Sequence, residues 1–274
     1  MSDVILYDAV DCINCFACMT ACSSENRLRE KRKTHQDIAV SMNSEGSDTY
    51  YLTPVSHEIG EFPNARTIVG FHHCNHCENA PCLENCPSHA IERRPGGQVV
   101  INEAACVGCQ TCVDVCPYNV PHYSPQTNKA SKCIGCYDRV ENGLPQACVS
   151  ACPTGALISG TREEMLEEGR KRRQHYQDTL KQDIVLYGDE APNDTVGKLN
   201  WLTIAPKEYS EQYLIPENPK EVGMQIRSVA KDVSGIGVGV TAGALALHGL
   251  FYFSQRKKQV QEAELKESQK QEEK

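Results

Sequence analysis

Apolar positions along the first 160 residues predict short elements only. The stretch Gln98–Ile101, with three aliphatic residues in a row, predicts a short strand. The 51 residues from Ser23 to His73 are polar and are interrupted by turn-forming residues, namely Gly46, Pro54, Gly60 and Pro63. Loops with short strands are therefore expected there.

The pattern changes after Gly160. Thr161–Glu164 has the sequence of a capping box, which predicts a helix that begins there and runs to about Gln182 as a solvated surface helix. Two strands are expected beyond it, Ile184–Tyr187 and Leu199–Ile204. We therefore assign residues 161–232 to a connecting helix and strands.

A membrane-sized stretch follows. From Val233 to Gln255, 23 consecutive residues carry no Asp, Glu, Lys or Arg. That length crosses about 30 Å of hydrocarbon with some tilt, so residues 233–255 are predicted to form a transmembrane helix. A buried helix of a soluble domain is the alternative. Glycines at 235, 239 and 243 lie on one helical face, a pattern typical of close packing in lipid.

Basic residues flank the stretch. Arg256, Lys257 and Lys258 follow it directly and begin a charged tail, residues 256–274, whereas Arg227 and Lys231 precede it. The small excess after the span predicts a cytoplasmic C-terminus. The rest of the chain is then expected on the periplasmic or extracellular side of the cell membrane.

Composition narrows the class of protein. The 274 residues carry a net charge of −8 and have no strongly basic region, so nucleic acid is not an expected partner. The stretch before the first cysteine is too short for a signal peptide, so no export signal is expected on this chain. Sixteen cysteines are too many for an ordinary cytosolic enzyme, and metal sites are expected to supply much of the cross-linking.

The cysteines form four quartets with no residue left over. The first and third have the spacing C-x2-C-x2-C-x3-C, the second has a longer middle step, and the fourth has an eleven-residue gap. Proline follows the last cysteine of every quartet but the first. The quartets are Cys12, Cys15, Cys18 and Cys22; Cys74, Cys77, Cys82 and Cys86; Cys106, Cys109, Cys112 and Cys116; and Cys133, Cys136, Cys148 and Cys152.

This spacing is typical of proteins that bind [4Fe–4S] clusters. Cysteines three apart on an irregular loop can turn their sulfur atoms toward one cluster, while the last cysteine lies a helical turn away and binds the neighbouring cluster. Disulfides are disfavoured because residues three apart pair poorly. Zinc is disfavoured because a third cysteine at the same step exceeds a tetrahedral site, and inert thiols would not recur in four matching quartets.

The spacing between quartets predicts the fold. Only nineteen residues separate the second quartet from the third, so these two are expected to form one ferredoxin-like half, with the first and fourth forming the other. The predicted class is α+β, with a four-cluster domain over residues 1–160 that contains the 23–73 insert, and one C-terminal transmembrane helix.

The chain resembles the four-cluster β subunits of the complex iron–sulfur molybdoenzyme family. The matching stretches are CNHCENAPC (74–82), CVGCQTC (106–112), CPYNVP (116–121) and ACPTGA (151–156). The later LYG (186–188), WLT (201–203), YLIP (213–216) and NP (218–219) are similar to membrane-bound formate dehydrogenase β subunits and to hydrogenase electron-transfer subunits. Two positions depart from the pattern: Ser23 stands in place of proline and His89 in place of glycine.

The resemblance implies how four [4Fe–4S] clusters are held. It implies one cluster on Cys12, Cys15, Cys18 and Cys152, and one on Cys133, Cys136, Cys148 and Cys22. It implies a third on Cys74, Cys77, Cys82 and Cys116, and a fourth on Cys106, Cys109, Cys112 and Cys86. We expect His72, His73 and His76 to surround the clusters without binding them. We expect His248 to be a packing or interfacial residue, with a haem ligand or a quinone contact as the alternative.

The implied function is electron transfer without catalysis on this chain. The expected partners are a catalytic molybdopterin subunit, foremost a molybdenum or tungsten formate dehydrogenase, and a membrane cytochrome b or quinone-binding subunit, together with membrane lipid. The same role beside a [NiFe] hydrogenase or another respiratory enzyme is an alternative. A structural membrane adaptor is a second alternative, although four clusters exceed what that role needs.

Overall fold

The structure is a computed structural model that describes residues 3–26, 51–125 and 127–219. The chain divides into two compact units, Met1–Gly223 and Met224–Lys274. The second unit lies outside the described residues, and so do the predicted transmembrane helix and charged tail. Within the described ranges, no helix combines the length and the apolar character that crossing a bilayer requires.

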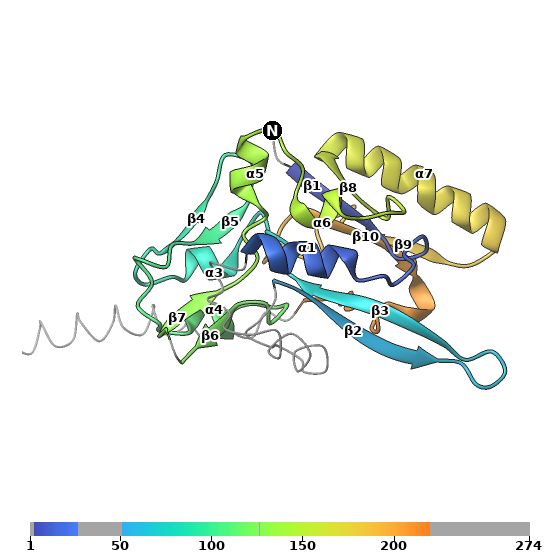
Figure 1. The fold of residues 1–274 in the computed structure, drawn as a ribbon, viewed down its shortest axis with the longest axis horizontal. Coiled ribbons are helices and arrows are strands. Elements are labelled where there is room, and N and C mark those ends of the chain that lie inside the picture. The colour runs from blue at the N-terminus through green and yellow to red at the C-terminus, as the bar shows by residue number, and fades with distance from the viewer. Residues whose placement is uncertain (1–2, 27–50, 126, 220–274) are drawn as a thin grey trace, which may run out of the picture. The chain divides into compact units, whose positions relative to one another are not determined.

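A four-stranded sheet forms the centre of the first unit (Figure 1). Its strands are β1 (Asp3–Asp8), β8 (Leu157–Thr161), β9 (Ile184–Tyr187) and β10 (Trp201–Pro206), in the order β8-β1-β10-β9. Strand β1 pairs in parallel with β10 and antiparallel with β8. The predicted strand at 184–187 is confirmed. The predicted strand at 199–204 lies two residues later, in the register that pairs Ile5 with Trp201.

Strand β1 was not predicted from the sequence. Its apolar run Val4–Tyr7 is continuous because both faces of the strand are covered. Val4 and Leu6 belong to the core beneath helix α7, whereas Ile5 and Tyr7 face a second core that contains several cysteines. The strand therefore joins the helix layer to the cysteine-rich layer.

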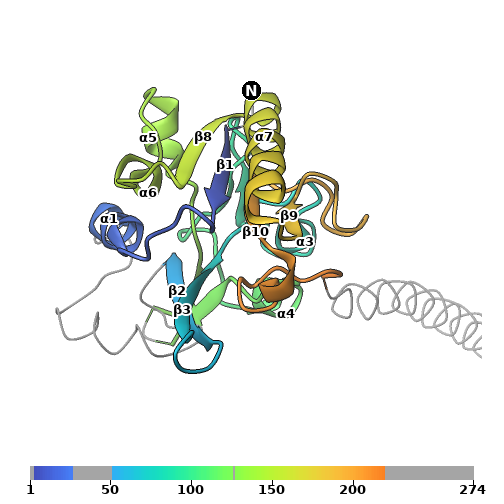
Figure 2. The same ribbon diagram turned by 90° about the vertical axis from the view of Figure 1, so that its right-hand side faces the viewer.

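Helix α7 (Arg162–Leu180) begins with the predicted capping box. The Glu164 amide donates a 3.3 Å hydrogen bond to Thr161 Oγ1, and the Thr161 amide donates to a Glu164 carboxylate oxygen at 2.9 Å. As expected for a surface helix, most of its residues are exposed or half-buried, while Met165, Gly169 and Tyr176 are buried on the sheet. Figure 2 shows the helix lying along one face of that sheet.

The insert between the first two quartets contains a long hairpin. Strands β2 (Leu52–Ile59) and β3 (Arg66–His73) pair antiparallel over eight residues each, so they are longer than the short strands expected. The rings of Phe71 and Tyr7 meet edge to face, with centroids 5.2 Å apart. The hairpin thus packs on the sheet and ends directly before Cys74.

Short elements surround the cysteines. They are α1 (Ala17–Asn26), α3 (Pro81–Glu84), α4 (Thr111–Asp114), α5 (Tyr137–Glu141), α6 (Ala147–Ser150), β4 (Ile91–Arg93), β5 (Val99–Ile101), β6 (His122–Ser124), β7 (Lys129–Ser131) and the 3-10 turn η1 (Lys207–Tyr209). Strand β5 confirms the strand predicted at 98–101. Antiparallel pairs join β4 to β5 and β6 to β7.

The short helices pack in two pairs, one in each predicted ferredoxin-like half. Helix α1 of the first quartet packs against α6 of the fourth, and α3 of the second packs against α4 of the third. This mixed α and β, ferredoxin-like architecture agrees with the predicted fold class. Strand β8 spans the predicted boundary at residue 160, and β9, β10 and α7 share a core with β1.

Candidate functional site

All sixteen cysteines lie within the described part of the chain, and none of them forms a disulfide. Most are buried or half-buried, and the two exposed ones, Cys15 and Cys109, occupy the same position in the first and third quartets. The repeated spacing in the sequence therefore corresponds to a repeated environment in the structure.

The first group of cysteines comprises Cys12, Cys15, Cys18 and Cys152, which line one small pocket. Three come from the loop and first turn of α1, and the fourth comes from the loop after α6. Burial, then the neighbouring Cys12, raises the pKa of Cys18 to about 12, with smaller contributions from Cys152 and Cys15. The four side chains implied by the resemblance as one ligand set thus lie together.

The second group comprises Cys74, Cys77, Cys82 and Cys116, which line another enclosed pocket. Burial raises the pKa of Cys77 well above its ordinary value, and Cys74, Cys116 and Cys82 raise it further. Cys116 follows α4 of the third quartet. The last cysteine of one quartet therefore faces the first three cysteines of another.

The third group comprises Cys106, Cys109, Cys112 and Cys86. Burial raises the pKa of Cys112 to about 12, and its thiol also interacts with Cys82, Cys106, Cys109 and Cys86. The packing of α3 on α4 brings the last cysteine of the second quartet to the loop of the third.

The fourth group comprises Cys133, Cys136, Cys148 and Cys22. Burial raises the pKa of Cys148 well above its ordinary value. The neighbouring Cys136, Cys133 and Cys18 raise it further. Cys22 lies in the same buried core as Cys148 because α1 packs on α6. The side-chain amide of Asn26 donates to Cys22 Sγ at 3.7 Å. The assignment of individual ligands to all four groups stays a prediction.

A common backbone turn shapes the loops. The second residue after the first cysteine of each quartet has a positive φ, at Asn14 (54°), His76 (45°), Gly108 (71°) and Gly135 (64°). In two quartets this turn directs an amide at sulfur: His76 N–H lies 3.5 Å from Cys74 Sγ, and Gly135 N–H lies 3.3 Å from Cys133 Sγ. Such amide contacts to sulfur are among the factors that set cluster potentials.

The chemistry of these groups fits a polynuclear iron cluster. Burial and neighbouring thiols raise the pKa of Cys82 and of Cys133 to about 12. The positive charge that the protein itself provides is therefore too small to keep these crowded thiols ionised as thiolates. Iron would supply that charge, as coordinating metals do for thiolates. Among the described residues, no three or more His, Cys, Asp or Glu side chains are arranged to hold a single metal ion.

Cys74 has a different environment. Burial alone would raise its pKa, but the neighbouring His76 and Lys132 outweigh burial and lower the pKa to about 5. Lys132 Nζ lies 3.6 Å from Cys74 Sγ. Sequence reasoning missed Lys132, whose position next to Cys133 was the only available signal.

The rings of the three histidines near the second quartet also have partners other than cysteine sulfur. His72 Nε2 lies 2.9 Å from the Tyr118 carbonyl oxygen, and the His73 ring stacks on Trp201 with centroids 3.9 Å apart. Burial lowers the pKa of His73 to about 3. His76 Nδ1 accepts a 3.0 Å hydrogen bond from the Val99 amide.

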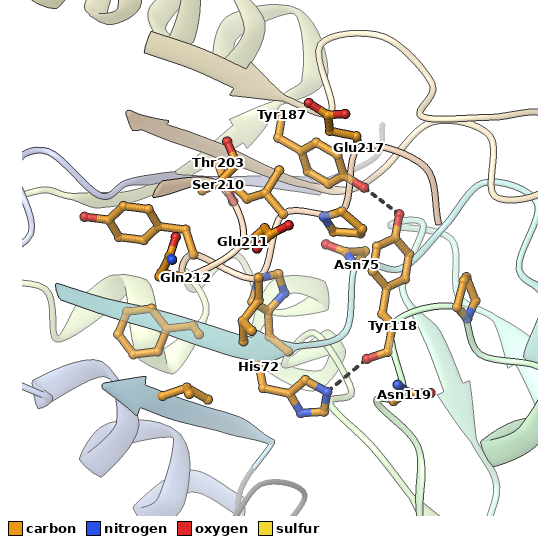
Figure 3. Close-up of a pocket in the computed structure, with 18 of the residues that line it drawn as sticks. His72, Asn75, Tyr118, Asn119, Tyr187, Thr203, Ser210, Glu211, Gln212 and Glu217 are labelled. Atoms are coloured by element: carbon orange, nitrogen blue, oxygen red, sulfur yellow. Dashed lines mark hydrogen bonds between the residues drawn. The ribbon is translucent and has the colours of Figure 1, made fainter. Parts of the chain in front are cut away.

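A cavity of about 960 Å³ is lined in part by Asn75 and Pro117, the residues that follow Cys74 and Cys116 in the chain. Figure 3 shows the side chains around it. It lies between the hairpin, the loop after Cys116 and the segment from Lys207 to Glu217. The hydroxyl groups of Tyr118 and Tyr187 meet there at 3.0 Å. Burial raises the pKa of both tyrosines, that of Tyr187 to about 12.

Comparison with known proteins agrees with this geometry. Residues 67–162 match the family model described as a 4Fe-4S dicluster domain. The chain is 28% identical over 246 residues to the formate dehydrogenase-O iron-sulfur subunit of Escherichia coli, covering 89% of this chain and 81% of that one. It is 37% identical over 164 residues to the thiosulfate reductase electron transfer subunit of Salmonella typhi, covering 59% of this chain and 77% of that one.

A third relative is the nitrate-inducible formate dehydrogenase iron-sulfur subunit of Escherichia coli. It is 34% identical over 168 residues, which cover 61% of this chain and 57% of the relative. The fold and the grouped thiols define the class of protein: an iron–sulfur protein whose cofactors are [4Fe–4S] clusters, with cysteines for four of them. The chain belongs to the family of iron–sulfur electron-transfer subunits of molybdoenzyme complexes.

Proposed function

We propose that this chain carries electrons between a molybdenum or tungsten formate dehydrogenase subunit and a membrane cytochrome b or quinone-binding subunit. The observation that carries the proposal is that Cys152 lines a pocket with the first three cysteines of the first quartet, and Cys116 one with the first three of the second, so that cysteine groups from different quartets share one fold. The chain itself turns over no substrate and acts with a catalytic partner.

The protein's own residues would hold and insulate the clusters. Each [4Fe–4S] cluster supplies one-electron transfer when it is bound. Hairpin, sheet and short helices keep most of the cysteines away from solvent, and amides such as those of His76 and Gly135 point at sulfur. Burial and these contacts would lower the reorganisation energy of electron transfer, because few surrounding groups need to move when the charge of a cluster changes.

Formate is the proposed substrate of the partner because the similarity to a formate dehydrogenase subunit covers 89% of this chain. The similarity to the thiosulfate reductase subunit, at higher identity over 59% of the chain, makes thiosulfate the second candidate. The two reactions run electrons in opposite directions. Formate would reduce the clusters, whereas thiosulfate would reoxidise clusters that had been reduced chemically.

The test is purification of the affinity-tagged chain with its partners, without oxygen, followed by addition of each substrate. We expect formate to reduce the clusters within the complex, as seen in electron paramagnetic resonance (EPR) spectra. The separated chain should show no such response, because catalysis is expected on the large subunit. Reoxidation by thiosulfate with no response to formate would reject the formate assignment and retain the electron-transfer role.

The proposed location is the outer side of the cell membrane, with a single span at residues 233–255 and a cytoplasmic C-terminus. The support is the uncharged stretch and the basic residues Arg256, Lys257 and Lys258 after it. Protease added to intact spheroplasts should then digest the cysteine-rich unit. Protection in spheroplasts together with digestion in inside-out vesicles would place that unit in the cytoplasm.

A further inference from the structure

Two cysteine loops from different quartets approach each other closely. The loop at Cys74 belongs to the second group and the loop at Cys133 belongs to the fourth. A Cβ atom placed on Gly135 would lie 3.3 Å from His76 Nε2 and 2.5 Å from Gln98 Cγ. A larger residue at position 135 would therefore press on the side chains of Gln98 and His76, and its φ of 64° also favours glycine.

Lys132 bridges the two loops from the fourth quartet's side. Its Nζ lies 3.6 Å from Cys74 Sγ, donates a 3.1 Å hydrogen bond to the Cys133 carbonyl oxygen and also donates to the Val99 carbonyl. The residue is only 2% exposed. A buried lysine is rare without compensation, and here the three contacts use its three donors.

The compensation for Lys132 comes from sulfur rather than from a carboxylate. In the described part of the chain, no Asp or Glu forms an ion pair with it, whereas the thiols of Cys74, Cys82 and Cys133 all interact with its charge. The ammonium group therefore stands as a positive charge between thiolate ligands of two groups. Its interaction with charge on either side is strong because the site is screened from water.

His76 complements this bridge from the second quartet's side. Its Nδ1 accepts the Val99 amide, so the ring proton lies on Nε2. That Nε2 is buried and finds no hydrogen-bond partner among the described residues. It faces the Gly135 turn of the fourth group, where the side of Gly135 that a Cβ atom would occupy is 3.3 Å away.

We propose that Lys132 forms an electrostatic bridge between the second and fourth groups that chiefly tunes the cluster of the second group, and that His76, which also lies beside Cys74, adds to this effect. A cluster becomes more negative when it is reduced, so a nearby ammonium group stabilises the reduced form and raises the reduction potential. A hydrogen bond to cluster sulfur acts in the same direction. The proposal rests on the predicted ligand sets and on the electron-transfer role.

The test replaces Lys132 in the complete complex and follows EPR spectra at controlled potentials. In K132M, one of the four clusters should shift to lower potential, with iron and sulfide contents unchanged. K132R keeps the charge and should shift that cluster less. The matched control is K129M, because Lys129 lies three residues earlier and contacts the Cys106 carbonyl instead of a sulfur atom.

Two further variants keep the test decisive. K132Q is neutral but keeps a polar end for the carbonyl groups, so it should reproduce the shift if K132M loses a cluster. H76N keeps an acceptor for the Val99 amide and removes the Nε2 donor, and it should lower the potential of the same cluster by a smaller amount. Unchanged potentials in K132M and K132Q at full iron content, or an equal shift of the same cluster in K129M, would overturn the bridge.

These readouts are separate from the proposed physiological role. Reduction by formate depends on the partner subunit, whereas the midpoint potentials can be measured with chemical mediators alone. A complex that ignores formate can still show the K132M shift, and a formate-reducible complex can still lack it.

Discussion

The Tyr176 hydroxyl on helix α7 donates a 2.9 Å hydrogen bond to Oδ2 of Asp8 at the end of strand β1. Asp8 is fully buried. Its other oxygen accepts hydrogen bonds from the amides of Val10 and Asp11, which lead directly to Cys12. One carboxylate therefore anchors both the long helix and the start of the first cysteine loop.

Arg172 is the charged partner of this carboxylate, at 3.3 Å, and R172M should destabilise the protein by about 2 kcal/mol. Burial raises the pKa of Asp8, although the hydrogen bond from Tyr176 opposes this rise. A raised carboxyl pKa means that its ionisation in the folded state costs stability as pH rises through that pKa. The loss in R172M should therefore be larger at pH 8 than near pH 4, close to the ordinary carboxyl pKa of 3.8, in urea unfolding.

The control for that variant is E168Q. Glu168 also pairs with Arg172, at 2.8 Å, but on the partly exposed side of the helix. Its replacement should cost less than about 1 kcal/mol. Equal losses in the two variants, or a loss in R172M that does not depend on pH, would show that Asp8 does not rely on Arg172.

The N-terminal cap of α7 provides a second test. Thr161 and Glu164 satisfy each other's amides, so T161A should lower stability by about 1 kcal/mol. T179A near the other end of the helix removes only a hydroxyl contact to the His175 carbonyl and should cost less than about 0.5 kcal/mol. The shift in urea midpoint decides, and a T161A loss no larger than that of T179A would contradict the capping role.

His89 occupies a left-handed turn with a φ of 51°, three residues after Cys86. The equivalent positions after Cys116 and Cys152 are Asn119 and Gly155, with φ of 53° and 71°. Because glycine adopts this conformation without strain, H89G should raise stability by up to about 1 kcal/mol. N119G should change it little, since asparagine tolerates the turn. A destabilised H89G variant would mean that the imidazole contributes more than the backbone strain costs.

Ligand exchange can be tested with a pair of serine variants. C22S should perturb the cluster held by Cys133, Cys136 and Cys148, because α1 brings Cys22 to the core of α6. C152S should perturb the cluster whose pocket is lined by the first three cysteines of the chain. EPR of the two variants should therefore show different clusters affected. Loss of the same cluster in both would contradict the assignment.

Cofactor content follows from the number of cysteines. Protein prepared without oxygen should contain about sixteen iron and about sixteen acid-labile sulfide per chain, and no stoichiometric zinc. Elemental analysis with a sulfide assay measures both quantities. Stoichiometric zinc, or only two clusters at full occupancy, would contradict four iron–sulfur sites.

Local patterns in the sequence predicted local features well. The capping box located the start of α7, and the aliphatic runs located β5 and β9. These features depend on residues close in the chain, so their signals need no knowledge of the rest of the fold. Strand β1 was missed because a four-residue apolar run acquires its meaning only from β8 and β10 on either side.

The sequence by itself determined the cofactor and the class of protein, because repeated cysteine spacing is a direct consequence of wrapping a loop around a cluster. The tertiary structure alone decided which side chains outside the quartets meet across the fold. Lys132 lies 58 residues from Cys74, and Tyr176 lies 168 residues from Asp8. Such contacts arise when separate loops and helices pack into one core, and no spacing within a single quartet encodes them.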